Sequence, residues 1–541
     1  MVTDELKYHI RQAFGFPPTV EQECAIAVFA DFLADQHQQT VMILRGAAGT
    51  GKTTLAAAIV RAMMTLHQKM VLMAPTGRAA KVFSLYAGQP AYTIHRRIYR
   101  QKSLEGGFSL NYNVAQDTLF IVDEASMVSL NGSESFGGNG LLDDLLQFVY
   151  GGQRCRLLLI GDHAQLPPVG ETESPALNTA CLRSYGLHVY ESTLNEVLRQ
   201  AAESGILFNA TRIRGYGGTV ARGYENSSEA EFSGVQGTLV PPSPRTPAPP
   251  IKISGFSDIH IVPGDELIEQ LATSYSRAGL DDTIVVTRSN KRANIYNEGI
   301  RRTVLDREDE LCRGDRLMIV KNNYYWVEQS RCEVRGARYE NSFEAESNGV
   351  QGALAPRTSH LVPREQNFSF IANGDVAVVQ RIRNVHEQHG FRFAEVTMTF
   401  PDYDDYELTA TVLLDTLTSE SPALTREQQQ QLFERVMADY ADIPHKADRL
   451  KKVKEDRYYN ALQVKFAYAV TCHKAQGGQW SHVYVDQGYM TDDMVTPEYY
   501  HWLYTAFTRA TAQLYLVNWP KTQVEDVREE GKISETPNKR L

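Results

Sequence analysis

The chain is short of cysteine pairs, of long apolar runs and of net positive charge. Its six cysteines are scattered without a C-x-x-C pair, so neither a disulfide framework nor a zinc module is indicated. No apolar run approaches the ~20 residues that span a bilayer, and the start, MVTDELKYHIRQAF, lacks the apolar segment of a secretory signal. We therefore expect a cytoplasmic protein in a reducing compartment, with no membrane segment.

The overall charge and composition limit the kinds of partner. The net charge is −10, from 55 Lys and Arg against 65 Asp and Glu. The molecule as a whole therefore does not attract a polyanion, and any nucleic-acid site must be a local patch. A chain of 541 residues that is 43% hydrophobic and 22% charged has ordinary globular composition. At about 150 residues per domain, we expect roughly three to four structural units.

The first third of the chain alternates short apolar runs with helical patterns. Continuous apolar strands separated by helices predict an α/β domain, in which a parallel sheet is covered by helices on both faces. The runs that we expect to form its strands are 41–44, 70–73, 119–122 and 156–160.

A second α/β unit is indicated by the apolar run at 283–286 and the helical pattern that follows it. Period-two alternation with turn residues at 321–418 predicts a small antiparallel barrel inserted into this unit. A charged, Gln-rich helical segment at 425–459, with charges that suit a solvated face, leads back to the α/β pattern. We expect the remaining strands of the second unit at 464–470, 482–485 and 513–517.

These patterns give a division of the chain into domains. The first α/β domain is expected at 1–190, with a hairpin insertion at about 96–117. The second is expected in two parts that flank the barrel insertion and the helical segment, and a charged tail ends the chain. The predicted ranges are 191–320 and 456–525 for the two parts, 321–455 for the insertion and 526–541 for the tail.

Two segments, 215–250 and 336–364, are rich in Gly, Ser, Pro and Glu and are predicted to be surface loops. They contain a repeat, because YENSSEAEFSGVQGTLVP from Tyr224 recurs as YENSFEAESNGVQGALAP from Tyr339. The repeat is too polar and Gly-rich for a solenoid unit. The sequence offers no physical explanation for it, and we assign it no catalytic role.

The strongest chemical signal is GAAGTGKTT, which follows the apolar run at 41–44 and opens an amphipathic helix. In that context the glycines let backbone N–H groups turn toward phosphate oxygens, Lys52 supplies a charge to the β and γ phosphates, and the Thr53 hydroxyl can ligate Mg²⁺. We therefore predict a site for ATP and Mg²⁺. Its expected nucleotide-binding residues are Gly46, Ala47, Ala48, Gly49, Thr50, Gly51, Lys52, Thr53 and Thr54.

Nucleotide hydrolysis also needs a carboxylate for Mg²⁺ and a base for the attacking water. Asp123 and Glu124 follow the apolar run at 119–122. We assign Asp123 to the metal shell and Glu124 as general base. The alternative is that the pair caps the next helix, which the nearby phosphate loop makes the weaker interpretation.

A third element, GDHAQLPPV, follows another apolar run and places Gln165 on a turn. Gln165 is a candidate sensor of the γ-phosphate. The prolines make the segment a rigid loop, so a purely structural turn is the alternative.

The order of the motifs along the chain resembles the superfamily 1B DNA helicases of the RecD and Dda type. The resemblance covers most of the chain outside the repeat segments and the tail. The motifs that carry it are Gln22 in FPPTVEQ, the phosphate loop, APTGRAA at 74–80, TIH at 93–95, DEAS at 123–126, GDHAQLPP at 161–168, EVLRQ at 196–200, AVTCHKAQG at 469–477 and YTAFTRA at 504–510.

The resemblance implies two RecA-like P-loop domains of AAA type, with a small hairpin insertion in the first and an SH3-like barrel in the second. It also implies an ATP-dependent DNA helicase that moves 5′→3′ on single-stranded DNA in repair, recombination or replication. Gln22 looks like the residue that contacts adenine, and Arg199 and Arg509 look like arginines that reach the γ-phosphate across a cleft. Gln476 and Gly477 would complete the nucleotide site. A guanidinium there stabilises the charge on the transferring phosphoryl group.

One departure from the pattern concerns the ribose. Relatives have an acidic residue shortly after the motif that ends at Gly477, where this chain reads Gly478, Gln479 and Trp480. This chain therefore lacks the carboxylate at the ribose position, although a neutral Gln479 can still hydrogen-bond a hydroxyl.

A nucleic-acid face is indicated by residues 76–104, which contain no Asp or Glu. Basic residues interleaved with aromatic ones suit a single strand, since they offer charge to phosphates and ring faces to bases. The alternative is a solvated helix face with aromatic residues in the core. The basic residues are Arg78, Lys81, Arg96, Arg97, Arg100 and Lys102, and the aromatic ones are Phe83, Tyr86, Tyr92 and Tyr99.

The resemblance places further residues along the same strand, and it suggests that the segment 106–114, with Phe108 and Tyr112, forms the hairpin that splits a duplex. The expected partners are single-stranded DNA and single/double-strand junctions, with repair or replication proteins unidentified. The alternatives are a single-strand translocase or RNA helicase of the same superfamily, and a nucleotide-gated DNA-binding subunit of a repair complex. The candidate nucleic-acid contacts are Thr76, Arg78, His95, Arg96, Thr471, His473 and Lys474.

Overall fold

The computed structural model describes residues 2–101, 108–132, 140–196, 203–216, 250–330, 371–491 and 494–525. Both copies of the repeat, most of the two predicted loops, the predicted tail at 526–541 and the candidate Arg199 lie outside the described residues. Within the described ranges, no helix has the length and apolar character needed to cross a membrane.

The first domain is built on a six-stranded parallel sheet with the order β3-β2-β6-β7-β1-β8. Alternate residues of β1 enter two different cores. Met42 and Leu44 pack with α2 and α3, whereas Val41 and Ile43 pack with α6. The predicted parallel sheet with two covered faces is therefore confirmed. Its strands are β1 (Thr40–Gly46), β2 (Lys69–Ala74), β3 (Ala91–Thr93), β6 (Thr118–Val122), β7 (Arg156–Gly161) and β8 (His188–Leu194).

The helices of this domain begin where the local sequence supplies caps. The Thr19 hydroxyl accepts from the Gln22 N–H and the Gln22 side chain accepts from the Thr19 N–H, which forms the capping box that starts α2. Thr76 caps α4 by accepting from Ala79 N–H. The helices are α1 (Val2–Phe14), α2 (Val20–Ala34), α3 (Lys52–Thr65), α4 (Gly77–Ala87), α5 (Ile94–Ile98), α6 (Leu141–Tyr150) and α7 (Thr179–Ser184), with 3₁₀ turns at Ala125–Met127 and Pro175–Leu177.

A short antiparallel hairpin extends from the first domain after α5. Its strands are β4 (Tyr99–Gln101) and β5 (Phe108–Leu110), with Tyr99 opposite Leu110. The connection between them lies outside the described residues. The hairpin falls within the insertion that was expected at about 96–117. The expected domain boundary at 190 falls inside β8, whose pairing with β1 makes all of β8 part of the first sheet.

The second domain has a five-stranded parallel sheet with the order β16-β10-β17-β18-β9. A further helix at 205–216 packs beside this sheet, with Ile206 and Ile213 in its core. The strands are β9 (Ile259–Val262), β10 (Thr283–Thr287), β16 (Ala469–Thr471), β17 (Trp480–Asp486) and β18 (Ala510–Val517). The helices are α9 (Leu267–Arg277), α10 (Asn290–Gly299), α15 (Cys472–Ala475) and α16 (Pro497–Phe507). A π-helical turn, Ile300–Val304, follows α10, and a 3₁₀ turn lies at Lys521–Gln523.

A closed five-stranded barrel is inserted into the second domain, as expected, but its first and last strands lie outside the range 321–418. The predicted run 464–470 is divided, because its first part closes the barrel in β15 while its last part enters the sheet as β16. Strand pairing between distant segments made this division, which local alternation does not record. The barrel strands are β11 (Arg316–Ile319), β12 (Val376–Gln388), β13 (Phe391–Phe400), β14 (Tyr406–Leu413) and β15 (Leu462–Phe466), with a 3₁₀ turn at Pro401–Tyr403.

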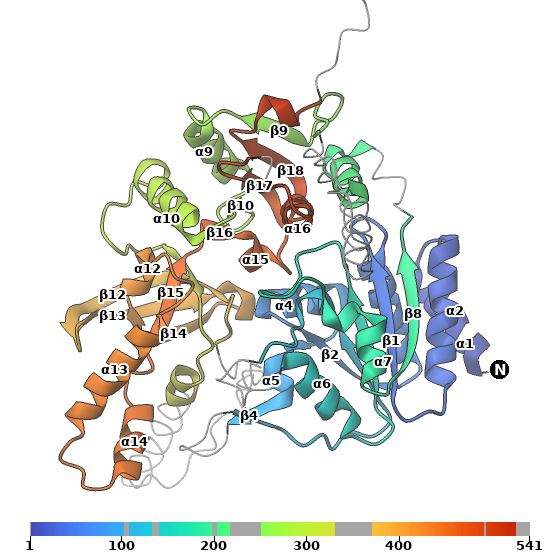
Figure 1. Cartoon of the computed structure of the whole chain (residues 1–541), viewed down its shortest axis with the longest axis horizontal. Coiled ribbons are helices and arrows are strands. Elements are labelled where there is room, and N and C mark those ends of the chain that lie inside the picture. Colours follow the sequence, from blue (N-terminus) through green and yellow to red (C-terminus); the bar gives the residue numbers. More distant parts are fainter. Residues whose placement is uncertain are drawn as a thin grey trace, which may run out of the picture.

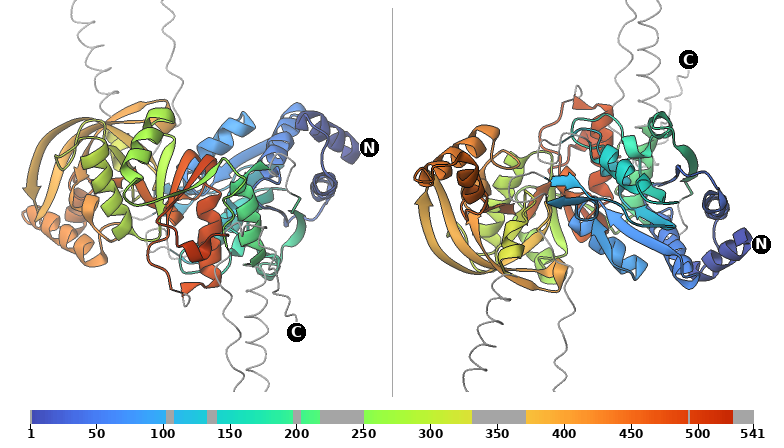
Figure 2. Two further views of the ribbon diagram at one scale, coloured as in Figure 1. Left: turned by 90° about the horizontal axis from the view of Figure 1, so that it is seen from above. Right: turned by 90° about the horizontal axis from the view of Figure 1, so that it is seen from below.

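The predicted helical segment forms a helical hairpin against the barrel. It consists of α13 (Arg426–Asp439) and α14 (Lys446–Lys454), after the short α12 (Asp415–Thr418). Leu432, Val436 and Val453 pack against Phe391 and Phe393 of the barrel. In Figures 1 and 2 the barrel and this hairpin lie at one end of the molecule and α1 and α2 at the other, with the second sheet between them. The α/β fold class with two parallel-sheet domains, a hairpin and a barrel insertion is thus confirmed.

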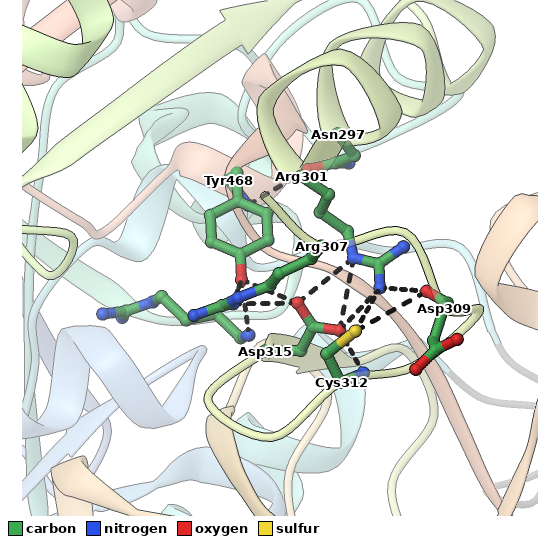
Figure 3. A network of polar contacts seen from close by, with 8 residues as sticks. Asn297, Arg301, Arg307, Asp309, Cys312, Asp315 and Tyr468 are labelled. Carbon is green, nitrogen blue, oxygen red and sulfur yellow. Dashed lines mark hydrogen bonds and ion pairs between the residues drawn. The ribbon is translucent and has the colours of Figure 1, made fainter. Parts of the chain in front are cut away.

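A buried polar network joins the barrel to the second domain (Figure 3). Asp315, just before β11, is fully buried and accepts hydrogen bonds from Arg301 (Nη2, 2.9 Å), Arg307 (Nη1, 2.9 Å) and the Tyr468 hydroxyl (3.0 Å). The Cys312 N–H also donates to Asp315, at 2.7 Å. One carboxylate thus connects the end of α10 to the start of the barrel and to the loop before β16.

We expect Asp315→Ala to lower the free energy of unfolding by about 3–5 kcal/mol, because it leaves buried guanidinium groups without their counter-charge. Urea and thermal unfolding measure the change. Glu420→Ala is the matched control, since its pair with Lys291 is exposed at 66% and 68% and should contribute about 0–1 kcal/mol. Equal stability of the two variants would contradict a supporting role for this network.

Candidate active site

The phosphate loop connects β1 to α3 in the conformation that the glycines were expected to provide. Gly49 and Gly51 have φ of 78° and 76°, a region that residues with a side chain rarely adopt. The Lys52 ammonium donates to the Gly46 carbonyl at 2.9 Å, so it already lies over the loop. The loop therefore has the turns that its glycines permit, with its lysine turned inward.

Asp123 and Glu124 lie at the carboxyl end of β6, two strands from β1 in the same sheet. Glu124 has a φ of 52°, an uncommon conformation for a residue other than glycine, of the kind found at functional sites. Its Oε2 is buried and, among the described residues, has no hydrogen-bond partner. Burial and the neighbouring Glu124 carboxylate raise the pKa of Asp123, and Lys52 opposes this effect. A cation would relieve this repulsion.

The loop after β7 places two further polar side chains beside the phosphate loop. Asp162 accepts from the Ala164 N–H at 3.0 Å, and the Gln165 N–H donates to the Asp162 carbonyl. The Gln165 side chain is buried, and its Oε1 has no partner among the described residues. This amide oxygen is thus available to a ligand.

Arg509 comes from the second domain, at the start of β18. Its guanidinium is buried and donates to the carbonyls of Thr505 (3.0 Å) and Gly478 (3.1 Å) and to the Thr508 hydroxyl (3.2 Å). All of these partners belong to the second domain. Arg509 therefore lies beside the phosphate loop, and its hydrogen bonds are made inside its own domain.

A tyrosine of α16 joins the second domain to the phosphate loop. The Tyr504 hydroxyl accepts from the Ala48 N–H of the phosphate loop at 2.8 Å and donates to the Asp162 carboxylate. Burial and Asp162 raise the pKa of Tyr504 well above its usual range, so the hydroxyl keeps its proton. The next residue, Thr505, accepts from the Leu166 N–H at 2.8 Å. Two motifs of the first domain are therefore bound directly to the YTAFTRA motif of the second.

These elements enclose a cavity of about 330 Å³ between the domains. Tyr86 of α4 and Leu207 also line it, and neither was predicted to do so. The cavity gathers most of the predicted nucleotide-site residues. Those that line it are Ala47, Ala48, Gly49, Gly51, Lys52, Thr53, Thr54, Asp123, Glu124, Gln165, Gly477 and Arg509.

Four predicted nucleotide residues do not line this cavity. Gln22 is buried and donates to the Thr50 carbonyl at 3.0 Å, so it braces the phosphate loop from behind. Gln476 donates to the Leu166 carbonyl at 2.7 Å, across the domain boundary. Thr50 and Gly46 lie within the loop itself. Arg199 is outside the described residues.

The residues present fit a magnesium ion. Mg²⁺ prefers oxygen ligands at a site that keeps water. The Thr53 hydroxyl and the Asp123 carboxylate line the same cavity, beside a Glu124 oxygen without a partner. The donor set is therefore of the correct chemical type.

The candidate nucleic-acid residues lie at the carboxyl ends of β2, β3 and β16. Thr76 caps α4, and Gly477 approaches it so closely that a Cβ on Gly477 would lie 3.2 Å from the Thr76 hydroxyl and 2.8 Å from Ala79. The α4 side of the first domain and the α15 side of the second are therefore in contact.

Arg78 and Lys81 on α4 make interdomain contacts. The Arg78 guanidinium lies 4.2 Å from the ring centre of Trp480 and donates to the Gln479 carbonyl at 3.1 Å. Lys81 donates to Asp402, in the turn between β13 and β14, at 3.0 Å. These cations were expected to face a nucleic-acid strand, whereas here they link the first domain to the second domain and to the barrel.

The remaining candidates differ in their surroundings. Burial lowers the pKa of His95 to about 4 and also lowers that of His473, so both rings are neutral at pH 7. Lys474 Nζ is buried without a hydrogen-bond partner among the described residues, and burial lowers its pKa to about 8. Thr471 begins α15, and Arg96 lies 5.1 Å from the ring centre of Tyr92.

Two of the four aromatic residues in 76–104 belong to the core. Phe83 is buried, and Tyr99 is buried with its hydroxyl bound to Asp144 at 2.7 Å. For these two the alternative interpretation was correct. On the hairpin, Arg100 lies 4.9 Å from the ring centre of Tyr112, which is 76% exposed.

Comparison with known proteins agrees with this geometry. Residues 21–215 match the AAA domain family, and residues 466–517 match the UvrD-like helicase C-terminal domain. The chain is 34% identical over 168 residues to the ATP-dependent RecD2 DNA helicase of Deinococcus radiodurans, and 31% identical over 194 residues to the ATP-dependent DNA helicase dda of Enterobacteria phage T4. The matched segments cover 31% and 33% of this chain.

The chain spans only part of these relatives, 21% of RecD2 and 38% of Dda. A solved structure of forked duplex DNA unwinding by Pif1 helicases is similar over 94% of this chain and 95% of that one, with 14% identity and a TM-score of 0.41. The two matched domains occur in the order of the motifs quoted above. The chain is therefore similar to DNA helicases of the RecD2 and Dda type in two regions, one in each α/β domain.

Proposed function

We propose that the chain is an ATP-dependent DNA helicase that translocates 5′→3′ on single-stranded DNA, in repair, recombination or replication. The observation that carries the proposal is the interdomain cavity in which Lys52 and Glu124 of the first domain meet Arg509 of the second. A catalytic site divided between two domains changes with their separation, so each turnover can be coupled to domain movement. The relatives named ATP-dependent DNA helicases support this assignment.

ATP hydrolysis would use residues that already line the cavity. The loop amides and Lys52 bind the phosphates, and Glu124 accepts a proton from the attacking water. Thr53 and Asp123 would hold Mg²⁺, which supplies charge stabilisation to the phosphates when bound. Gln165 and Arg509 would contact the γ-phosphate, and the Arg199 assignment rests on the resemblance alone.

The Tyr504 contact gives a physical route from nucleotide to domain movement. The Ala48 N–H that Tyr504 binds belongs to the phosphate loop, and the Asp162 that Tyr504 also binds belongs to the loop that carries Gln165. A γ-phosphate in the cavity would compete with Tyr504 for the Ala48 N–H and with Asp162 for the Tyr504 O–H. Loss of the phosphate after hydrolysis would return Ala48 to Tyr504.

A strand would pass where α4 and α15 meet. The buried Lys474 ammonium, without a partner among the described residues, suits a phosphate, because a buried cation is stabilised by a nearby opposite charge. Thr76, His95, Thr471 and His473 lie at strand ends in the same region, and neutral histidines can hydrogen-bond phosphates without adding charge. Contacts of this type follow the backbone and do not read bases. Strand passage would require Arg78 and Lys81 to exchange their interdomain contacts for phosphates.

The test has two parts. We expect single-stranded DNA to stimulate phosphate release, and a duplex with a 5′ tail to be displaced while a duplex with only a 3′ tail is not. Displacement should fall as salt is raised, because phosphate contacts are screened. Lys52→Ala provides the background without turnover.

Each alternative has its own outcome. Stimulation by single strands without displacement of any duplex would indicate a translocase, and displacement of RNA duplexes in place of DNA would indicate an RNA helicase. DNA binding that responds to ATP without turnover would indicate a nucleotide-gated DNA-binding subunit. Displacement from the 3′ tail alone would contradict the direction and leave the ATPase assignment intact.

A further inference from the structure

A second group of chemically reactive side chains lies at the other end of the first sheet. Asp35 follows α2, His37 comes two residues later, and His188 begins β8. The pairs Thr40–His188 and Gly46–Leu194 are in register, so the group is six residues along β1 from the phosphate loop, about 20 Å in a strand. None of its members lines the nucleotide cavity.

The three side chains lie close together, with each imidazole ring against one oxygen of the Asp35 carboxylate. His37 Nδ1 lies 2.7 Å from Asp35 Oδ1, and His188 Nδ1 lies 2.9 Å from Asp35 Oδ2. One ligand atom from each residue can be chosen so that all three lie within 4.8 Å of one another. Two imidazoles and one carboxylate form a donor set that suits zinc and similar divalent transition metals.

The carboxylate is held in a fixed orientation by groups that are not potential ligands. The His37 backbone N–H donates to Oδ1 at 3.0 Å, and the Tyr190 hydroxyl donates to Oδ2 at 3.1 Å. Burial alone would raise the pKa of Asp35, but these hydrogen bonds and those to the two rings lower it well below its usual range. Metal sites are commonly supported by this kind of outer contact, which orients the ligands.

The two rings have room to adjust to an ion. The side chains of His37 and His188 are 74% and 53% exposed. Zinc–ligand distances of about 2.0–2.2 Å in a tetrahedron place neighbouring ligand atoms roughly 3.3–3.5 Å apart. The three ligand atoms lie within 4.8 Å of one another, so the exposed rings need to shift by at most about 1.5 Å to reach these distances, and the exposed side leaves space for water as a fourth ligand.

The neighbouring Arg156 does not pair with the Asp35 carboxylate. Arg156 donates to the Asp35 backbone carbonyl and to the Thr40 hydroxyl, and its guanidinium lies 5.8 Å from the ring centre of Phe32. It therefore binds the peptide of Asp35 and leaves the carboxylate to the histidines.

We propose that Asp35, His37 and His188 form a binding site for a divalent transition-metal ion of the zinc type, separate from the nucleotide site. The ion would connect the end of α2 to the start of the edge strand β8. The other ends of these elements are already connected, because Glu21 of α2 accepts from the N–H groups of Asn195 and Glu196 after β8. The metal would thus complete a second clamp across the sheet edge.

The experiment is a titration of the chelator-treated full chain with ZnCl₂, without nucleotide, by isothermal calorimetry. We expect one ion per chain, a visible Co²⁺ absorption of a four-coordinate site, and a melting temperature that rises with Zn²⁺. His188→Gln and Asp35→Asn should each weaken binding at least 10-fold, in line with removal of a ligand. His445→Gln, an exposed histidine at the start of α14, is the matched control and should bind as the wild type does.

Asp35→Asn is nearly isosteric. Its Oδ1 can keep the hydrogen bond from the His37 N–H, and its NH2 group can donate to the Tyr190 hydroxyl oxygen, so the variant separates loss of a ligand from loss of the fold. All variants should retain the wild-type melting temperature without zinc to within a few degrees. Absence of stoichiometric Zn²⁺ binding by the wild type would overturn the proposal. Unchanged binding by the double variant His37→Gln/His188→Gln would do so as well, because the ion would then be bound elsewhere.

Discussion

Glu124→Gln is expected to reduce DNA-stimulated ATP turnover by about 10²–10⁴-fold, the contribution of a positioned general base. The Glu124 carboxylate has a buried oxygen without a partner among the described residues, and it lines the cavity that holds the phosphate loop. Glutamine keeps the shape and removes the basic oxygen. Phosphate release at saturating ATP with single-stranded DNA measures the loss.

ATP binding separates this variant from Lys52→Ala. The Lys52 ammonium lies over the loop, 2.9 Å from the Gly46 carbonyl, so its removal should weaken binding as well as turnover. Glu124→Gln should bind a fluorescent ATP analogue as the wild type does. Glu498→Gln, an exposed acid in the first turn of α16, is the control and should behave as wild type. A Glu124→Gln variant that hydrolyses ATP at the normal rate would disprove the assignment of the base.

The parts of the site that sequence could predict are those fixed by short-range patterns. Few structures other than a phosphate loop fit an apolar strand that is followed by a glycine-rich segment and a lysine. The loop and Lys52 therefore lie where they were expected. Asp123 and Glu124 come together with them because parallel strands end at one edge of the sheet. For the same reason Gln165, after β7, reaches the same cavity.

The parts that sequence missed depend on contacts between distant segments. In the sequence, Tyr504 was noted only as part of the motif YTAFTRA. Its role as the link between Ala48 and Asp162 follows from how the two domains dock. The available signal was the run of aromatic and hydroxyl side chains in one helix, PEYYHWLYTAF. A hydroxyl needs a hydrogen-bond partner when it is buried.

The charged face of α4 is a second case in which contacts with distant segments could not be predicted from the local sequence. The absence of acidic residues at 76–104 predicted a basic surface, but Arg78 and Lys81 find their acceptors hundreds of residues away, at Gln479 and Asp402. Local composition reports the charge of a helix face and not what covers it. Phe83 and Tyr99 were likewise ambiguous, since an aromatic residue suits a core as well as a base.

The barrel boundaries have a related physical cause. Alternation marked β12, β13 and β14, which pair with their neighbours in the chain. The strands β11 and β15 are short, and they pair across an interval that holds the whole insertion, with Leu317 opposite Phe466. Their apolar residues therefore resembled the α/β pattern on either side.

Arg509→Ala is expected to lower turnover by about 10³–10⁵-fold, the range known for arginines that stabilise a transferring phosphoryl group. The Arg509 guanidinium donates to two carbonyls and a hydroxyl of its own domain. A γ-phosphate is a stronger partner than a carbonyl because the hydrogen bond is then charge-assisted on both sides. Movement of Arg509 onto the phosphate would pull the second domain toward the first.

The measurement must separate this role from a structural one, since Arg509 is only 3% exposed. Arg509→Lys keeps the charge but cannot make the planar pair of contacts, so it should also lose at least 10²-fold in kcat while its melting temperature stays near that of the wild type. Arg302→Ala, which removes an exposed ion pair with Glu298, is the matched control and should stay within a factor of two. If the Lys variant turns over ATP normally, or if kcat falls only in proportion to unfolded protein, Arg509 supports the fold and does not act on the phosphate.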